Sequence, residues 1–199
     1  MTEAVQNNER WQRLANAATF AMSIHAEQTR KGAETPYIGH LLGVASLVLE
    51  NGGDEDQAIA GLLHDAIEDQ GAHQESVIAE KFGVRVAAIV RGCTDAETTP
   101  KPPWRTRKEA YVAHLEHAGT DILLVSCADK LYNARAIRTD LRTHGLAVFE
   151  RFNAGKDGTL WYYSALAEAF GRLLPGPLSA ELAETVEEIH LMARGLEAQ

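Results

Sequence analysis

The stretch at residues 54–70, DEDQAIAGLLHDAIEDQ, most constrains what this chain can fold into. Its apolar residues recur at the three- and four-residue spacing of one buried helical face. On the polar side the same spacing places His64 one turn from Glu68, and it places Asp65 one turn from Asp69. Like charges so close cost roughly 0.2–0.5 kcal/mol per pair, and a cation would relieve that repulsion. We therefore expect one helix with a candidate metal site, although a solvated acidic face would show the same pattern.

The composition indicates an ordinary soluble protein. The chain has 199 residues, of which 45% are hydrophobic and 24% charged, enough for one domain with a sizeable core. We expect a single domain over residues 1–199, with its core at about 10–175 and a C-terminal helix at about 178–196. The net charge of −9 disfavours binding to nucleic acid or to an anionic membrane surface.

The cysteine usage and the absence of long apolar runs indicate the compartment. Cys93 and Cys127 lie in apolar segments without metal-ligand spacing, so we expect both to be free packing residues. No apolar run is long enough to span a bilayer, and the N-terminal segment lacks the pattern of a secretion signal. These features predict a cytoplasmic protein without membrane partners.

Helical periodicity recurs along the chain and no segment reads as a strand, which predicts an all-α class. Glycines, prolines and capping residues mark the expected helix ends, and Asp54 is expected to cap one helix. We expect helices at about residues 9–28, 38–50, 54–70, 74–82, 84–92, 106–118, 120–137, 159–173 and 179–195. The acidic last helix would suit either a homo-oligomer or a packed terminal helix.

Two basic segments stand out in this acidic chain. The first, at residues 30–36, contains Arg30 and Lys31 and is interrupted by glycine and proline, so we expect a loop. The second, at residues 101–108, follows a cluster of prolines and leads into a helix. It fits either a solvated helix start or a phosphate-binding patch.

Four candidate metal ligands stand on three of the expected helices: His40, His64, Asp65 and Asp129. Asp129 ends the apolar run 122–128, where an unpaired carboxylate would be costly. Two imidazoles and two carboxylates suit Mn²⁺, Fe²⁺ or Mg²⁺ with positions open to water, rather than a structural zinc. Such an ion acidifies water and polarises a phosphoryl oxygen, which is the chemistry of phosphate-ester hydrolysis.

The order of these motifs, a His, then His-Asp, then a distant Asp, resembles the HD superfamily of metal-dependent phosphohydrolases. More specifically, the chain resembles the hydrolase domain of RelA/SpoT enzymes and the stand-alone small alarmone hydrolases. The matching segments are HAEQTRKG at 25–32, PYIGH at 36–40, GVA at 43–45, LHDAIED at 63–69, KFG at 81–83 and ADKLYNAR at 128–135. Their combination is more specific than any one segment, and it implies a helical HD domain bundle.

The resemblance also implies roles for individual residues. It implies that Mn²⁺ is bound by His40, His64, Asp65 and Asp129. Glu68 and Asp69 would orient and deprotonate the attacking water. Arg30 matches a residue that stacks on the purine, Lys31 its neighbouring cation, and Asn133 a nucleoside contact. Phosphate clamps are matched only by region, with these candidates: Lys101, Arg105, Arg107, Lys108 and Lys156. His25 matches a motif without being a ligand, and we expect it to pack behind the site.

We consider three functions, and the expected partner is a small-molecule purine nucleotide polyphosphate. The leading hypothesis is Mn-dependent hydrolysis of the 3′-pyrophosphate of (p)ppGpp or (p)ppApp, releasing pyrophosphate and GDP or GTP, or the adenosine equivalents. The runner-up is a nucleotide phosphomonoesterase acting on the 2′-phosphate of NADPH or on a 5′-mononucleotide. A non-catalytic alarmone-binding regulator is the third, and the complete set of candidate ligands argues against it.

Overall fold

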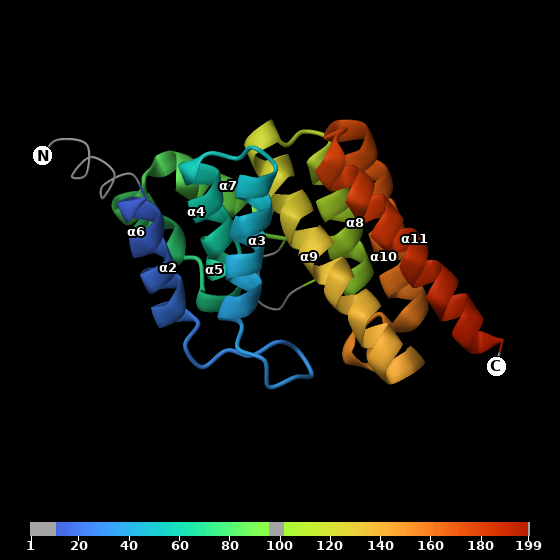
Figure 1. The fold of residues 1–199 in the computed structure, drawn as a ribbon. Coiled ribbons are helices and arrows are strands. Elements are labelled where there is room, and N and C mark those ends of the chain that lie inside the picture. Colours follow the sequence, from blue (N-terminus) through green and yellow to red (C-terminus); the bar gives the residue numbers. More distant parts are fainter. Residues whose placement is uncertain (1–10, 96–101, 199) are drawn as a thin grey trace, which may run out of the picture. The chain divides into compact units, whose positions relative to one another are not determined.

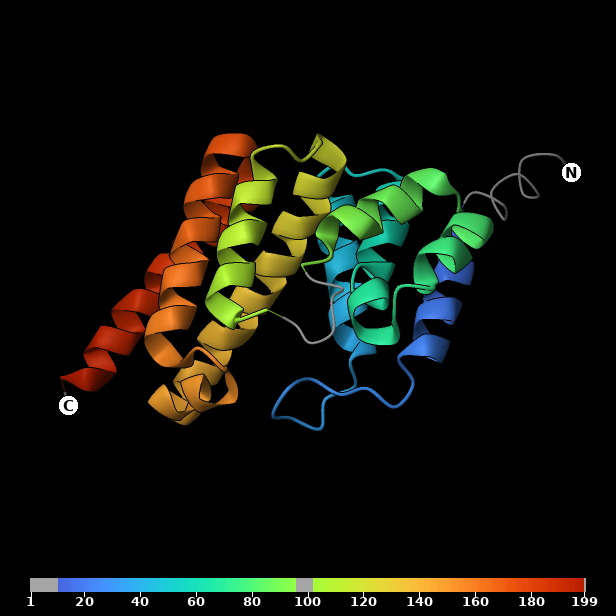
Figure 2. The same cartoon turned by 180° about the vertical axis from the view of Figure 1, so that it is seen from behind.

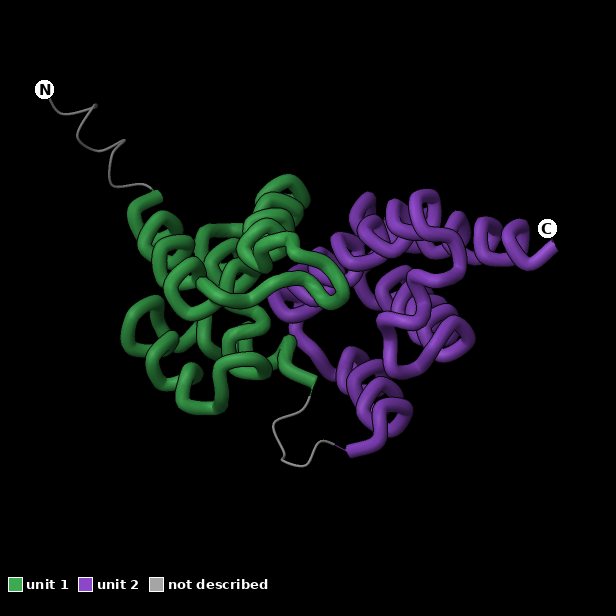
Figure 3. Tube along the Cα trace, turned by 90° about the horizontal axis from the view of Figure 1, so that it is seen from below, with its two compact units in different colours: residues 1–97 green, residues 98–199 purple. Residues whose placement is uncertain are grey.

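The computed structural model describes residues 11–95 and 102–198. Regular structure in these ranges is helical, apart from one isolated antiparallel bridge between Thr29 and Pro36, which confirms the predicted all-α class. The chain divides into two compact units, residues 1–97 and 98–199, coloured separately in Figure 3. The expectation of a single domain over the whole chain stays a prediction.

Unit 1 is organised around helix α4 (Glu55–Leu63), whose residues from Ala58 onward are all buried. Three helices pack directly against it: α2 (Gln12–Ile24), α3 (Ile38–Glu50) and α7 (Val84–Cys93). The two short helices α5 (Ala66–Gln70) and α6 (Gln74–Phe82) pack against each other and against α7 (Figure 1). The bounds of α3 and α6 agree with the predicted spans, whereas α2 ends before the predicted limit at residue 28.

The start of α4 is capped by Asp54, as predicted. The Asp54 carboxylate accepts a hydrogen bond from the Gln57 backbone N–H at 3.0 Å, and the Gln57 side chain accepts one from the Asp54 N–H at 2.7 Å. This reciprocal capping box satisfies two backbone donors that a helix start otherwise leaves unpaired. Arg85 of α7 forms an ion pair with the same carboxylate at 2.7 Å. The beginning of α4 is therefore held both by its own sequence and by α7.

Gly61 allows α3 and α4 to approach each other closely. A Cβ at this position would lie 3.2 Å from the Cα of Ala45 on α3, tighter than nine in ten real Cβ contacts. Glycine at this position therefore lets the two backbones meet. Their close contact helps to bring His40, in the first turn of α3, near His64 at the end of α4.

The prediction of one continuous helix over 54–70 is wrong, because the helix is interrupted at His64 and Asp65. These two residues form a turn between α4 and α5. The His64 Nδ1 lies 2.8 Å from the Gly61 carbonyl oxygen. The imidazole thus competes for the acceptor that the Asp65 backbone N–H would use in an unbroken helix. Helical structure resumes in α5, so the periodicity of the sequence conceals the interruption.

Unit 2 is built around the long helix α9 (Thr120–His144). This helix packs against α10 (Gly155–Leu173), α11 (Pro177–Glu197) and the 3-10 helix η1 (Gly145–Arg151). The remaining helix, α8 (Trp104–Leu115), packs against α10 (Figure 2). The unit is thus a small helical bundle of its own.

α9, α10 and α11 extend beyond their predicted spans, whereas α8 begins two residues before its predicted span and ends at Leu115, before the predicted limit at residue 118. α9 continues past residue 137 because Leu141 is buried and Arg138 forms an ion pair with Glu188 of α11 at 3.0 Å. The 3-10 helix after it was not predicted. Residues 138–144 of α9 carry few apolar side chains, so tertiary contacts rather than periodicity keep this extension helical.

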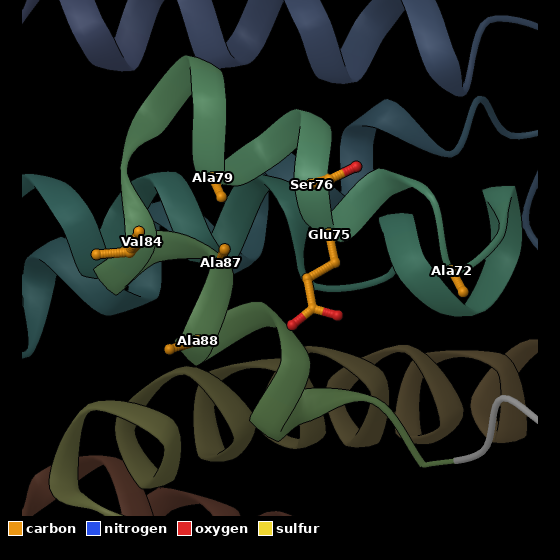
Figure 4. A pocket seen from close by; sticks show the side chains of 7 residues that line it. All are labelled: Ala72, Glu75, Ser76, Ala79, Val84, Ala87 and Ala88. Atoms are coloured by element: carbon orange, nitrogen blue, oxygen red, sulfur yellow. The ribbon is translucent and has the colours of Figure 1, made fainter.

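Within the described residues, no helix combines the length and apolar character needed to cross a membrane. Neither Cys93 nor Cys127 forms a disulfide bond; Cys127 is buried, as expected of a packing residue, whereas Cys93 is only partly buried. An open hollow of about 390 Å³ between α6 and α7 is lined mostly by alanines (Figure 4). Its one charged lining residue, Glu75, lies 3.7 Å from Arg91 in an ion pair. None of the predicted site residues lines this hollow.

Candidate metal centre

Three of the predicted ligands meet in unit 1. His40 lies in the first turn of α3, and His64 and Asp65 form the turn between α4 and α5. The two Nε2 atoms are 3.2 Å apart, and Asp65 Oδ2 lies 3.0 Å from His64 Nε2 and 3.6 Å from His40 Nε2. Both imidazoles are buried, whereas the Asp65 side chain is 21% exposed. The cluster can therefore be reached from solvent on the carboxylate side.

The spacing of these ligand atoms fits a divalent ion. Two ligands about 2.1 Å from one ion lie about 3.0 Å apart at a right angle and about 3.4 Å apart at the tetrahedral angle. The three measured separations lie close to this range. Nitrogen and oxygen donors together suit a borderline or hard divalent cation. His40, His64 and Asp65 thus form a possible metal site.

The hydrogen bond on the far side of His64 determines which ring nitrogen faces the cluster. A carbonyl oxygen only accepts, so the hydrogen in the 2.8 Å contact with Gly61 is carried by His64 Nδ1. In the neutral imidazole the lone pair is then on Nε2, which faces the Asp65 carboxylate. The Nε2 lone pair of His64 and the Asp65 carboxylate repel each other at 3.0 Å, and a cation bound between the two groups would remove this repulsion. A histidine held at one nitrogen by a carbonyl is typical of metal ligands.

Tyr37 orients the carboxylate of the cluster, a role that the sequence did not reveal. Its hydroxyl donates a hydrogen bond to Asp65 Oδ2 at 2.5 Å. Its ring lies 5.3 Å, centroid to centroid, from the His40 ring. Tyr37 therefore touches two of the three possible ligands and supports both from the residue just before α3.

Glu68 and Asp69 lie on α5, directly after the turn that carries His64 and Asp65. Gln28 donates a hydrogen bond from Nε2 to Asp69 Oδ2 at 2.7 Å. Although Asp69 is exposed on one side, the protein atoms around it and the charge of Asp65 raise its pKa, and the Gln28 hydrogen bond partly offsets this. A raised pKa brings a carboxylate closer to the range that suits a proton acceptor at neutral pH.

The loop with Arg30 and Lys31 is an ordered turn between α2 and α3. The Arg30 N–H donates to the Thr35 carbonyl at 2.9 Å, beside the bridge that closes the loop. The Arg30 guanidinium carbon lies 5.8 Å from the centroid of the Tyr37 ring, and Lys31 is exposed. The predicted basic loop therefore lies next to Tyr37, which contacts two of the possible metal ligands.

Asp129 is buried on α9 in unit 2, and both of its oxygens accept hydrogen bonds. Lys130 Nζ donates to Oδ2 at 2.6 Å, and Asn133 Nδ2 donates to Oδ1 at 2.5 Å. Burial opposes the charge of Lys130, but the Asp129 carboxylate holds the pKa of that amine well above its usual range. Lys130 was not predicted as part of the site. Convergence of Asp129 on the three ligands of unit 1 stays a prediction.

The basic residues at the start of α8 interact with aromatic rings and acidic groups of unit 2. The Arg105 guanidinium carbon lies 3.2 Å from the centroid of the Trp161 ring, and its Nε lies 2.7 Å from Glu109 Oε1. Lys108 Nζ lies 5.0 Å from the centroid of the Tyr162 ring. These contacts hold the two cations against α10.

The other three predicted phosphate clamps differ in their surroundings. Arg107 donates from Nε to the Pro102 carbonyl at 3.3 Å. Lys156 is hydrogen bonded to Glu197 and lies 3.6 Å from Asp157, so two carboxylates already balance its charge. Lys101 lies outside the described residues. Lys156 is therefore the weakest of the described candidates for holding a phosphate.

A family model described as "HD domain" matches residues 17–160 of the chain. The chain is 41% identical over 128 residues to the guanosine-3′,5′-bis(diphosphate) 3′-pyrophosphohydrolase MESH1 of Xenopus tropicalis, covering 63% of this chain and 69% of that protein. It is 40% identical over 125 residues to the protein of the same name from Homo sapiens, covering 61% of this chain and 68% of that one.

A solved structure, described as a metazoan ortholog of SpoT that hydrolyses ppGpp, superposes with a TM-score of 0.72. The superposition covers 92% of this chain and 96% of the other, at 24% sequence identity. At that level of identity the likeness supports the fold alone.

Proposed function

This chain belongs to the HD domain family, and we propose that it is a metal-dependent phosphohydrolase that removes the 3′-pyrophosphate of guanosine 3′,5′-polyphosphates. The observation that carries the proposal is the cluster of His40, His64 and Asp65, with Glu68 and Asp69 following on α5. The relatives named for this reaction on guanosine 3′,5′-bis(diphosphate) support the choice of substrate.

The proposed metal ligands are the three clustered residues together with Asp129. Mn²⁺ is the proposed ion, and Fe²⁺ or Mg²⁺ would suit the same mixture of nitrogen and oxygen donors. A bound divalent ion supplies Lewis-acid chemistry by acidifying water and polarising a phosphoryl oxygen. His64 donates a hydrogen bond to the Gly61 carbonyl and Asp65 accepts one from the Tyr37 hydroxyl, and these two bonds keep the side chains in the orientation that binding requires.

Glu68 and Asp69 are the proposed proton acceptors. The water oxygen bonds to the phosphorus attached to the 3′ oxygen of the ribose, and the bond between that phosphorus and the ribose oxygen breaks. The carboxylates take a proton from the attacking water, and the ribose oxygen gains a proton as it leaves. The products are pyrophosphate and a nucleoside 5′-di- or triphosphate.

Substrate binding is assigned to basic and polar side chains. Arg30 stacks on the purine, Lys31 adds positive charge beside it, and Asn133 contacts the nucleoside. The proposed phosphate ligands are Lys101, Arg105, Arg107 and Lys108, with Lys156 as the weakest. The adenosine analogue ppApp is proposed as a second substrate, because stacking on a guanidinium does not by itself distinguish the two purines.

One panel of assays tests this function against its alternatives. The full chain is incubated with Mn²⁺ and ppGpp, ppApp, NADPH or a 5′-mononucleotide, and the products are resolved by ion-exchange chromatography. We expect pyrophosphate from ppGpp. Orthophosphate from NADPH or a mononucleotide would instead identify a phosphomonoesterase, and the absence of any turnover would contradict the proposal.

A variant separates catalysis from binding. Glu68→Gln removes a proton acceptor while keeping the size of the side chain, so we expect turnover to fall by about 10²- to 10⁴-fold. Nucleotide affinity, measured by calorimetry, should change little. Unchanged turnover in this variant would remove Glu68 from the mechanism, and binding without turnover in the wild-type chain would indicate an alarmone-binding regulator.

A further inference from the structure

A chain of hydrogen bonds runs from the buried His25 through Gln28 to Asp69, and the mechanism proposed above gives His25 and Gln28 no role. His25 Nδ1 lies 2.6 Å from Gln28 Oε1, and Gln28 Nε2 lies 2.7 Å from Asp69 Oδ2. We propose that Gln28 is a positioning residue that aims the Asp69 carboxylate, and that His25 fixes the orientation of the Gln28 amide. This inference rests on the proposed function, in which Asp69 accepts a proton from water.

The contact with Asp69 determines the orientation of the Gln28 amide. On its other side, Gln28 Oε1 lies 2.6 Å from His25 Nδ1 and 3.3 Å from Gln70 Nε2, which is also 3.4 Å from that Nδ1. The Asp69 carboxylate, which accepts, faces Gln28 Nε2. A flipped amide would set acceptor against acceptor, so Gln28 presents its N–H₂ to Asp69.

His25 is suited to holding the Gln28 oxygen. The residue is 3% exposed, and its ring lies 5.7 Å, centroid to centroid, from the Tyr37 ring. Its Nε2 is buried and has no hydrogen-bond partner among the described residues. A hydrogen on Nε2 would be buried without a partner, which is costly, whereas a hydrogen on Nδ1 can be donated to Gln28 Oε1.

Gln28 acts from the same piece of backbone that supports the metal cluster. The Tyr37 N–H donates to the Gln28 carbonyl at 2.9 Å, beside the bridge between Thr29 and Pro36. On this short paired segment, Gln28 donates to Asp69 and Tyr37 donates to Asp65. Gln28 and Tyr37, which are hydrogen bonded to each other, therefore fix the position of the proposed proton acceptor Asp69 relative to the possible metal ligand Asp65.

Kinetics of four variants tests the role of the chain. Gln28→Leu and His25→Leu should lower kcat for ppGpp about 10- to 100-fold, while KM and Mn²⁺ affinity stay within about threefold of the wild type. His25→Asn keeps an N–H near the Nδ1 position and should recover most of the kcat lost in His25→Leu. Gln12→Leu, on the exposed face of α2, is the matched control and should leave kcat unchanged.

Two further measurements keep the outcome decisive. If Gln28→Leu does not fold, Gln28→Glu preserves the side-chain shape but turns an acceptor toward Asp69, and kcat should fall again. Independently of activity, long-range ¹H–¹⁵N NMR should find the hydrogen of His25 on Nδ1. A wild-type kcat in the Gln28 variants, no recovery in His25→Asn, or hydrogen on His25 Nε2 overturns the positioning role. An inactive wild-type chain instead overturns the proposed function.

Discussion

The Nε2 atoms of His40 and His64 lie 3.2 Å apart, although 24 positions separate the two residues in the chain. The two imidazoles meet where α3 packs against α4, beyond the close contact of Gly61 with Ala45. The absence of a side chain at Gly61 and the geometry of the metal centre are thus linked.

Gly61→Ala should destabilise the protein and disturb the metal centre together. The added Cβ would meet the Ala45 backbone, and overpacking of this kind costs about 1–3 kcal/mol of unfolding free energy. Urea denaturation measures the loss. The matched control is Gly171→Ala on α10, where a Cβ meets nothing within 4 Å. Alanine there should raise the free energy of unfolding by about 0.5–1 kcal/mol. Equal stability of the two variants would contradict the close-contact account.

Tyr37→Phe should weaken metal binding without unfolding the chain. The ring stays in place beside His40, but Asp65 loses the hydroxyl that holds one of its oxygens. Loss of such a supporting hydrogen bond typically lowers metal affinity about 10- to 100-fold. Calorimetric titration with Mn²⁺ measures the change, with Tyr163→Phe on α10 as the control. An affinity equal to that of the wild type would show that Tyr37 does not orient the ligand.

Much of this architecture is readable from the sequence, because local signals and tertiary structure agree. The Asp54 cap and the span of α3 follow from capping chemistry and apolar spacing. The possible ligands His40, His64 and Asp65 follow from the order of motifs rather than from periodicity, since no local pattern brings α3 and the end of α4 together.

Other features depend on contacts between distant residues and leave no local signal. The interruption at His64 depends on its side chain binding the Gly61 carbonyl, while the apolar spacing continues unbroken through it. Gln28 and Tyr37 lie within recognisable motifs, but their bonds to Asp69 and Asp65 depend on how the loop closes. The hydrogen bond from Lys130 to Asp129 was not predicted, because two adjacent residues on a helix point in different directions and their spacing does not indicate a contact.

Asp54→Asn should lower stability in a pH-dependent way. Burial tends to raise the pKa of Asp54, but the Gln57 N–H and the Arg85 guanidinium lower it below its usual value. A lowered folded-state pKa stabilises the protein above the unfolded pKa of about 3.9, and the benefit is lost as pH falls through the folded value. Near neutral pH the free energy of unfolding of the wild type should exceed that of Asp54→Asn by about 0.5 kcal/mol; the difference is small because the Asp54–Arg85 ion pair is exposed. Urea denaturation across pH should show this gap closing below about pH 4; a gap that widens would contradict the pairing.

The Cys127 thiol should be unreactive in the folded protein. Burial raises the pKa of Cys127 to about 12, so almost no thiolate is present at about pH 8. A chromogenic disulfide reagent should label Cys127 only after unfolding in guanidinium chloride. Mass spectrometry of peptides identifies the labelled cysteine, and Cys93, which is less buried, serves as the internal comparison. Rapid labelling of Cys127 in the native chain would contradict its burial.

Electron paramagnetic resonance of Mn²⁺ titrated into the full chain tests the metal centre most directly. His64→Ala and Asp65→Asn each remove a possible ligand, whereas His117→Ala changes an exposed histidine in unit 2 and serves as the control. We predict that the wild type and His117→Ala bind Mn²⁺ alike and that both cluster variants lose the tight site. Mn²⁺ binding that survives unchanged in His64→Ala and Asp65→Asn would contradict the account.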